Sequence, residues 1–381
     1  MRPKIKESIL PYVVHDGKIH IGFNDQSITI EDEDGKIDLF LKQMNGAYTL
    51  EELASITNTS IDDAVDALDM LNEYGLVEDN DSLNLLNEEE TARYKSNLNF
   101  FTNFSSLEES KYSFQQKLKD SKVVLLGIGG SNLVASCLAG MGIGHLVVLD
   151  FDTVETSNLT RQFLFTEDDV GRYKTEVARE RLLKINGNMK IDIYNREVTG
   201  IDSLIDILQG ADLVIAMIDS PTILTSRWVN SVCYHYGIPF VQGRLGPMRM
   251  FLQKFHPGNG ACFDCSIIES LRIDPMYEER LRMWYNREFR PNNPSFAPNV
   301  SVLCGMIASE VANTLLGVMK PLEQGTTVTF FPGNYESFQM HAWQRVKECP
   351  TCGGRSDKNR LEEPVDIEEI ITIAKQGMTV L

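Results

Sequence analysis

The sequence predicts an α/β protein with a doubly wound, Rossmann-like and mostly parallel sheet, a small winged-helix-like α+β domain before it, and a zinc-bound C-terminal part. Apolar runs in "KVVLLGIGG", "HLVVLDFD", "ADLVIAMID" and "IPFVQGRL" are typical of buried strands, and helical stretches lie between them. Strands that alternate with helices in this way indicate a doubly wound sheet. The glycine-rich stretch "GIGG" at 127–130 directly follows the first run.

The first 85 residues have shorter, alternating runs. Two of them meet at His15-Asp16-Gly17, which predicts a β-hairpin, and a third run follows. Thr49 and Glu52 have the spacing of a capping box that starts a helix. Apolar residues then recur at helical spacing before Gly75, namely Ile61, Ala64, Val65, Leu68 and Leu71. Strands combined with a pair of helices predict a winged-helix-like domain.

Charge limits what this domain binds. The chain has 36 basic and 54 acidic residues, a formal net charge of -18, and its predicted helix at 61–73 is especially acidic. Such a surface repels phosphate, so we expect neither nucleic acid nor an anionic membrane as partner. A free edge strand beside a helix can instead bind an extended peptide. A structural or dimerisation role is the alternative.

The whole chain is assigned to four parts. They are the winged-helix-like domain at 1–85, a helical linker at 86–120, the nucleotide-binding domain at 121–355 and a C-terminal tail at 356–381. The N-terminus has no signal-peptide pattern, and no run approaches the ~18 apolar residues of a membrane helix. We therefore predict a cytoplasmic protein without a membrane partner.

The glycine turn predicts a nucleotide site but leaves its type open. The backbone N–H groups of Gly127, Gly129 and Gly130 can face a phosphate at the start of the next helix. Asn132 stands where the dinucleotide fingerprint has its third glycine. Asp150 ends the second strand about 20 residues after the turn, where a carboxylate can bind ribose hydroxyls. These features suit a nicotinamide enzyme as well as an ATP-dependent one.

The segment after the second strand favours ATP. It contains Asn158, Arg161, Gln162 and Lys174, and a nicotinamide site has little use for such charge. Transfer of a nucleotidyl group needs cations at the phosphate oxygens, which Arg161 and Lys174 would supply as catalytic residues. Asp219 follows a later strand and should face the same crevice, where a carboxylate can hold Mg²⁺. A Rossmann dehydrogenase is therefore disfavoured.

Four cysteines predict a metal centre. Cys262 and Cys265 form one C-x-x-C pair, and Cys349 and Cys352 form another about 80 residues later. Two such pairs are typical of a structural zinc site. The remaining three cysteines, which lie in apolar helical runs, are expected in the core.

Together these motifs resemble the ubiquitin-activating-type adenylyltransferases, the ThiF/MoeB-like family. The likeness extends over about residues 118–355, from "LKDSKVVLLGIGG" through "VLDFDTVETSNLTRQFLFTEDDVGRYKTE" and "MIDSP" to both C-x-x-C pairs. It implies ATP, Mg²⁺ and Zn²⁺, with Asp150 on the ribose and Asp219 on Mg²⁺. It implies that Asn158, Arg161, Gln162 and Lys174 hold the triphosphate. It also implies a homodimer.

"NLTRQFLFTEDDVGRYKTEV" and "FRPNNPSFAPNVSVLCGMIASEV" are most similar to the branch that matures microcin C, with the pantocin A branch as a relative. That likeness implies adenylylation of a carboxylate or amide oxygen in a ribosomally made precursor peptide, which the N-terminal domain binds. A sulfur-carrier adenylyltransferase and a non-catalytic peptide-binding adaptor are the alternatives. The family's arginine that reaches the partner's ATP is replaced by Ser96, so Arg93 or Lys95 is the candidate for that contact.

Overall fold

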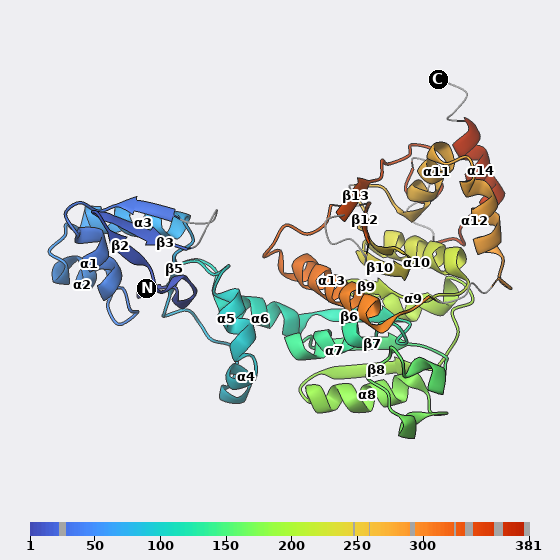
Figure 1. The fold of residues 1–381 in the computed structure, drawn as a ribbon, viewed down its shortest axis with the longest axis horizontal. Coiled ribbons are helices and arrows are strands. Elements are labelled where there is room, and N and C mark those ends of the chain that lie inside the picture. The colour runs from blue at the N-terminus through green and yellow to red at the C-terminus, as the bar shows by residue number, and fades with distance from the viewer. Residues whose placement is uncertain are drawn as a thin grey trace. The chain divides into compact units, whose positions relative to one another are not determined.

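The computed structural model describes residues 1–381 except 23–27, 247, 259, 290–293, 324, 332–337, 354–360 and 377–381. The asparagines of the "FRPNNPSF" stretch at 292–293 thus lie outside the described residues. The chain consists of two compact units, residues 1–117 and 118–381 (Figure 1). The first unit contains the region predicted as winged-helix-like and most of the predicted linker.

Three short antiparallel strands and three helices build the start of the first unit. They are β2 (Val13–His15), β3 (Lys18–Ile21), β4 (Ile28–Glu31), α1 (Lys36–Gln43), α2 (Leu50–Ile56) and α3 (Ile61–Glu73). Asp16 and Gly17 have φ angles of 48° and 70°, so the predicted hairpin turn is confirmed. The Thr49–Glu52 capping box is also confirmed. In α3 the predicted apolar face is only partly right, because Ile61 and Val65 are exposed.

The rest of this unit consists of a two-stranded sheet and three further helices. Strand β1 (Pro3–Ile5) pairs antiparallel with β5 (Val77–Asp79), a pairing that the sequence analysis missed. Helices α4 (Glu88–Arg93), α5 (Lys95–Phe101) and α6 (Lys111–Asp120) follow. Glu78 on β5 accepts from Lys111 on α6 at 2.9 Å between Oε1 and Nζ, which ties the strand pair to this helical part.

An eight-stranded sheet forms the centre of the second unit. Its order is β13-β12-β11-β10-β9-β6-β7-β8. The strands are β6 (Lys122–Leu126), β7 (His145–Leu149), β8 (Lys190–Tyr194), β9 (Leu213–Ala216), β10 (Phe240–Leu245), β11 (Met250–Phe255), β12 (Thr326–Phe330) and β13 (Phe338–Ala342). Strands β8, β7, β6, β9 and β10 run parallel, and the last three are added antiparallel. The predicted mostly parallel, doubly wound sheet is confirmed.

Helices cover the sheet on both faces (Figure 1). Helix α7 (Asn132–Met141) packs against α8 (Lys174–Ile185) and α13 (Ala297–Leu316), and α9 (Asp202–Leu208) packs against α10 (Thr222–Tyr236). Val124 and Leu126 on β6 belong to the core cluster that also contains α9 and α10. Successive strand residues point to opposite faces, so Val123 and Leu125 face the other side.

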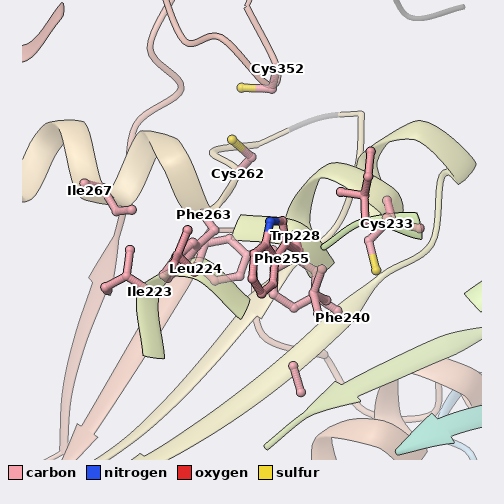
Figure 2. Packing of buried hydrophobic residues seen from close by; sticks show 14 of the residues in the cluster. Ile223, Leu224, Trp228, Cys233, Phe240, Phe255, Cys262, Phe263, Ile267 and Cys352 are labelled. Atoms are coloured by element: carbon pink, nitrogen blue, oxygen red, sulfur yellow. The ribbon is translucent and has the colours of Figure 1, made fainter. Parts of the chain in front are cut away.

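The apolar core continues beyond the sheet towards the C-terminus. Trp228, Phe255 and Phe263 pack together near the cysteines Cys262 and Cys352 (Figure 2). Helices α11 (Phe263–Ile273) and α12 (Tyr277–Tyr285) extend this cluster. The region predicted as a tail contains α14 (Ile367–Gln376), which packs against α11 and buries its isoleucines. The sequence analysis did not anticipate this helix.

Helix α13 corrects the prediction that no apolar run approaches the length of a membrane helix. By length and composition its 20 residues could span a membrane, contrary to the statement that no run approaches that length. It packs, however, against α7, β10 and β11. Glu310 in its middle is buried and pairs with the equally buried Lys254 on β11, with 2.8 Å between Oε1 and Nζ. A buried ion pair with the sheet identifies α13 as a core helix.

Candidate active site

The sheet order brings the predicted site residues to one edge. After β6 the chain first builds β7 on one side and later β9 and β10 on the other, so the topological switch point lies between β6 and β9. Ligands of doubly wound sheets bind outside the carboxyl ends of the strands at this point. The glycine turn follows β6, Asp150 follows β7 and Asp219 follows β9. All three therefore lie at the same edge of the sheet, where such folds have their ligand crevice.

The glycine turn is shaped by close backbone contacts. Gly127 has a φ of +89°, and a Cβ there would lie 2.8 Å from the carbonyl oxygen of Met217 after β9. Any other residue at this position would force the two strand ends apart. A Cβ on Gly129 would lie 3.1 Å from Nε2 of Gln162, whereas Gly130 faces open space. Gly130 therefore leaves room for a ligand at this turn.

Asn132, which stands where the dinucleotide fingerprint has its third glycine, connects two segments through its side chain. Ser131 is the N-cap of α7, and Asn132 is the first helical residue. The Asn132 side chain is fully buried. Its Nδ2 donates to the carbonyl oxygen of Gly129 at 2.8 Å, and its Oδ1 accepts from the N–H of Leu164 at 3.3 Å. In place of the missing glycine, the side chain of Asn132 thus connects the glycine turn to the loop after β7 by hydrogen bonds.

Asp150 is held by backbone donors at the same turn. Its Oδ2 accepts from the N–H of Ile128 at 2.8 Å, and its Oδ1 accepts from the N–H of Asp152 at 2.9 Å. Burial raises the pKa of Asp150, although these hydrogen bonds and the charge of Lys174 oppose the rise. A buried carboxylate fixed in this way is suited to accept hydrogen bonds from a ribose.

The cations of the loop after β7 face the crevice. Lys174, the first residue of α8, is buried, and its Nζ lies 2.7 Å from Oδ2 of Asp152. Arg161 donates through Nη1 to the carbonyl oxygen of Ser157 at 2.9 Å. Both side chains are thus positioned by their own loop. Their positive charges also oppose the rise in the pKa of Asp219.

Two amide side chains of this loop differ in what they offer a ligand. Asn158 is buried, and its Oδ1 accepts from the N–H of Glu155 at 3.1 Å, so its oxygen braces the loop. Gln162 is also buried, and its Oε1 has no hydrogen-bond partner among the residues that the structure describes. An unpartnered polar atom beside the glycine turn is what a site for a polar ligand would contain. The nucleotide-binding roles of both residues remain predictions.

Three cations act on Asp219, which follows β9. Desolvation raises its pKa, while the charges of Arg244, Arg161 and Lys174 counteract the rise and that of Asp150 adds to it. Next to it, the buried Oγ of Ser220 has no partner in the structure. The residues present therefore fit Mg²⁺ and phosphates, which would be held between Asp219 and these cations.

Arg244 was missed by the sequence analysis. It lies at the carboxyl end of β10, in the run "IPFVQGRL" that was assigned simply as a buried strand. An arginine and a glutamine within an otherwise apolar central strand were the available signal, because buried polar side chains need a specific reason.

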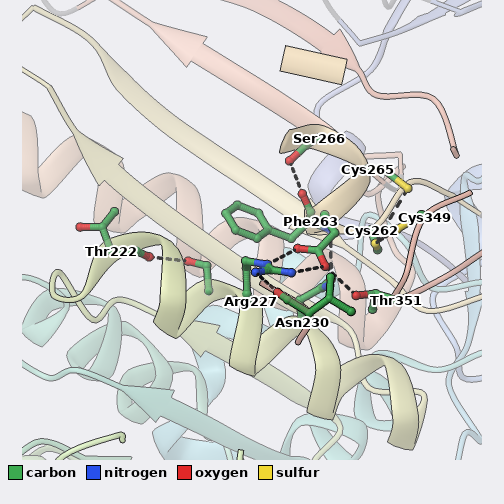
Figure 3. A network of polar contacts seen from close by, with 12 residues as sticks. Thr222, Arg227, Asn230, Cys262, Phe263, Cys265, Ser266, Cys349 and Thr351 are labelled. Atoms are coloured by element: carbon green, nitrogen blue, oxygen red, sulfur yellow. Dashed lines mark hydrogen bonds and ion pairs between the residues drawn. The ribbon is translucent and has the colours of Figure 1, made fainter. Parts of the chain in front are cut away.

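The four predicted metal ligands come together in the second unit. Figure 3 shows three of them, Cys262, Cys265 and Cys349. The Sγ atoms of Cys262, Cys265, Cys349 and Cys352 all lie within 4.8 Å of one another, and all four residues are buried. Individual Sγ–Sγ distances are 3.9 Å for Cys262–Cys265, 3.5 Å for Cys262–Cys349 and 3.3 Å for Cys265–Cys352. Four thiolates at about 2.3 Å from one Zn²⁺ would lie about 3.8 Å apart, so the cluster fits zinc.

The other three cysteines do not all lie in the core. Cys233 and Cys304 are buried as expected, but Cys137 on α7 is exposed. The expectation for Cys137 was therefore wrong.

Comparison with known proteins identifies the family. A model described as "ThiF family" matches residues 94–352. The chain belongs to the ThiF family. The sulfur carrier protein ThiS adenylyltransferase of Escherichia coli K12 is 30% identical over 248 residues, which are 63% of this chain and 89% of that protein. This ThiF-family chain is thus a relative of adenylyltransferases, enzymes that use ATP.

Two solved structures share the fold with this ThiF-family chain. Escherichia coli MccB, in a crystal structure with AMPCPP and MccA, superposes with a TM-score of 0.74 at 23% identity, over 93% of this chain and all of that one. A crystal structure of PaaA superposes with a TM-score of 0.69 at 22% identity, over 88% of this chain and 98% of that one. Both matches extend well beyond the family domain, and at these identities they show the fold alone.

Proposed function

We propose that this protein uses ATP to adenylylate a carboxylate or amide oxygen of a ribosomally synthesised precursor peptide, as a step in the maturation of a peptide antibiotic of the microcin C or pantocin type. The observation that carries this proposal is the crevice at the switch point. Asp219 follows β9 there, and the charges of Arg161 and Lys174 from the segment after β7 and of Arg244 from β10 all act on it. Such a concentration of cations suits displacement at a phosphorus atom.

Each group has a role in this reaction. Asp150 would accept hydrogen bonds from the ribose, and the glycine turn would donate to phosphate. Arg161 and Lys174 would neutralise the charge that develops on the departing pyrophosphate. Asp219 would hold Mg²⁺, which would neutralise phosphate charge further. The zinc cluster would be structural, because four cysteines leave no open coordination position.

The first unit would bind the precursor peptide. In its three-stranded sheet, β2 and β4 each pair with only one strand among the described residues. Val13 and Val14 on β2 are 58% and 48% exposed. An edge strand with exposed apolar side chains can accept an extended peptide as an additional strand. We expect this binding to be separable from ATP binding.

We propose that the enzyme is a homodimer and that it acts in the cytoplasm. In the loop and turn between β7 and α8, Phe151, Phe163 and Val170 are 51%, 55% and 46% exposed. Several large apolar side chains on one loop suggest a surface that a second copy covers. Arg93 or Lys95 would then be the candidate for a contact with the partner's ATP.

One alternative is adenylylation of a sulfur-carrier protein, which the ThiS adenylyltransferase relative favours. It uses the same ATP residues but gives no role to the first unit. To discriminate, pyrophosphate release would be measured with short peptides encoded beside the gene and with a carrier protein ending in Gly-Gly. Release with the carrier alone would contradict the peptide proposal. A non-catalytic adaptor, the other alternative, would release no pyrophosphate with either.

The test of the ATP site is the Asp219→Ala variant. Peptide-dependent pyrophosphate release should fall about 100-fold or more, the scale expected when one preorganised charge contact is lost. The affinity for fluorescently labelled peptide should stay unchanged, because the first unit binds it. Asp202→Ala on α9, in the first turn of that helix and outside the crevice, is the matched control. Normal turnover of Asp219→Ala would show that Asp219 is not the metal ligand.

A further inference from the structure

Helix α10 contacts two parts of the second unit, the carboxyl edge of the sheet and the cysteine cluster. Its first turns hold two groups of the sheet edge. Oγ1 of Thr222 donates to the carbonyl oxygen of Asp219. Nη2 of Arg244 donates to the carbonyl oxygen of Thr222 at 3.1 Å and to Oγ of Ser226 at 2.6 Å. The position of α10 therefore sets where the backbone of Asp219 and the guanidinium of Arg244 lie.

A neighbouring stripe of α10 contacts the cysteine cluster. Arg227, Asn230 and Tyr234 are spaced by three and four residues, so they lie on one face of the helix. Oδ1 of Asn230 accepts from the N–H of Phe263, within the first C-x-x-C pair, at 2.9 Å (Figure 3). The hydroxyl of Tyr234 donates to the carbonyl oxygen of Cys352, in the second pair, at 3.4 Å. Helix α10 is thus hydrogen-bonded to both pairs.

Arg227 makes the charged contact of this stripe. Its side chain is almost completely buried, and its Nε and Nη2 donate to Oδ1 and Oδ2 of Asp264 at 2.8 Å and 3.3 Å. Its Nη1 donates to the carbonyl oxygen of Val365 at 2.7 Å. Asp264 lies within the first C-x-x-C pair and accepts from Oγ1 of Thr351, within the second pair, at 2.7 Å. A bidentate pair of this kind fixes orientation as well as distance.

These directional contacts fix α10 in a way that apolar packing does not. Helix α10 also packs against α9, α11 and α12, but hydrophobic burial has no preferred direction. A buried ion pair contributes little net stability, because the desolvation of both charges offsets their attraction, so its main effect here is to hold one geometry. At the other end, four thiolates within 4.8 Å of one another repel each other unless a cation lies between them. A bound metal therefore fixes the two C-x-x-C pairs relative to each other, and Asp264 with them.

We propose that Arg227 is a positioning residue for the ATP site: it holds α10 where the metal-bound cysteine cluster places it, and α10 in turn places Asp219. The inference rests on the proposed function, in which Asp219 holds Mg²⁺. Ser226 and Arg227 are consecutive residues of one helix, so a movement that follows loss of the Arg227 contacts also moves the first turns of α10. The cluster thus acts on the reaction although no cysteine contacts a reactant.

The test is a double variant, Arg227→Met with Asp264→Leu, which replaces the buried pair by apolar side chains of similar size and leaves neither charge unpaired. The protein should stay folded, with a melting temperature near that of the wild type. The Mg²⁺ concentration needed for half-maximal ATP binding should rise about 10-fold, the scale of one charge-assisted contact. The kcat of peptide-dependent pyrophosphate release should fall about 100-fold, the cost of displacing a reacting group by about 1 Å, while the KM for peptide stays unchanged.

Lys254→Met with Glu310→Leu is the matched control. This pair is also buried, with 2.8 Å between Nζ and Oε1, but it joins β11 to α13. In the sheet Lys254 lies opposite Val241, whereas Arg244 at the carboxyl end of β10 lies opposite Phe251. The control thus removes two buried charges away from α10 and from the carboxyl edge, and its Mg²⁺ requirement should equal that of the wild type.

Removal of the metal tests the same connection from its other end. Zinc-free wild-type protein, measured well below its melting temperature, should show the same raised Mg²⁺ requirement. Zinc removal from the double variant should add nothing to it, because two changes that break one connection are not additive. Arg227→Lys, which keeps the charge but not the paired hydrogen bonds, should lie between the wild type and the double variant, and it replaces the double variant in this comparison if the latter does not fold.

The outcomes separate this inference from the proposed function. A wild-type Mg²⁺ requirement in the folded double variant, or in Arg227→Lys where that variant replaces it, would overturn the inference alone. An equal further rise on zinc removal from the wild type and from the variant would do the same. A wild-type protein that binds no ATP at any Mg²⁺ concentration would overturn the proposed function as well.

Discussion

Arg227 and Asp264 form an ion pair, with 2.8 Å between Nε and Oδ1, in which both side chains are 1% exposed. Oδ2 of Asp264 also accepts from Oγ1 of Thr351 at 2.7 Å, and Nη1 of Arg227 donates to the carbonyl oxygen of Val365 at 2.7 Å (Figure 3). The pair therefore joins α10 to both halves of the cysteine cluster and to the segment before α14.

Asp264→Ala should lower the free energy of unfolding by about 3–5 kcal/mol, because it leaves the Arg227 charge buried without a partner. Thr351→Val, which removes only one hydrogen bond of the same group, should cost about 1 kcal/mol. Urea unfolding of both variants checks the difference. Equal losses in the two variants would show that the ion pair is not the main contributor.

The cysteine cluster leads to a second prediction. Cys262→Ser or Cys349→Ser should lower the zinc content and the melting temperature together, because a structural metal contributes its binding free energy to folding. Cys137→Ser, an exposed cysteine outside the cluster, should change neither. Metal analysis and calorimetry provide the two measurements. A wild-type protein that lacks zinc and melts normally would contradict the assignment.

The sequence predicted the sheet well because buried parallel strands are apolar on both faces. The apolar runs that form β6, β7 and β9 are therefore typical of buried parallel strands. The C-x-x-C pairs were equally clear, since their spacing is set by metal geometry. Helix α14 was missed although Ile367, Ile370, Ile371 and Ala374 recur at helical spacing, because the region after the cysteines was assigned simply as a tail.

The site residues were harder to predict where their neighbours come from distant parts of the chain. Asn132 was interpreted by its place in a local motif, yet its partner Leu164 lies 32 residues away. Arg244 acquires meaning only from its contacts to Thr222 and Ser226, which sequence spacing does not show. The role of each of these two residues depends on hydrogen bonds to residues that are distant in the sequence, and a local sequence pattern does not show such bonds.

Placing the fingerprint's third glycine at position 132 gives a third prediction. Asn132→Gly would remove the hydrogen bonds to Gly129 and Leu164 and would place a flexible residue in the first turn of α7. We expect a loss of about 2 kcal/mol in the free energy of unfolding. ATP affinity should fall as well, because the turn and the loop with Arg161 lose their brace. Isothermal titration with ATP checks this, with Ser136→Gly, later in the same helix, as the control for helix propensity. A stability loss with unchanged ATP affinity would show that the brace serves the fold alone.

The raised pKa of Asp219 predicts a pH-dependent requirement for Mg²⁺. Desolvation at the carboxyl end of β9 disfavours its charged form more than the nearby cations favour it, so the carboxyl group binds a proton at higher pH than an ordinary aspartate, although the residue itself is exposed. A protonated carboxyl group cannot hold the metal, so peptide-dependent pyrophosphate release should decrease as the pH falls through this raised pKa. Metal and proton compete for one site, so more Mg²⁺ should move the decrease to lower pH. Asp150 also has a raised pKa but is not assigned to the metal, so a decrease due to Asp150 would not respond to Mg²⁺. The measurement is a series of pH–rate profiles at increasing Mg²⁺ concentration, and profiles that stay superimposed at all concentrations would exclude Asp219 as the titrating ligand.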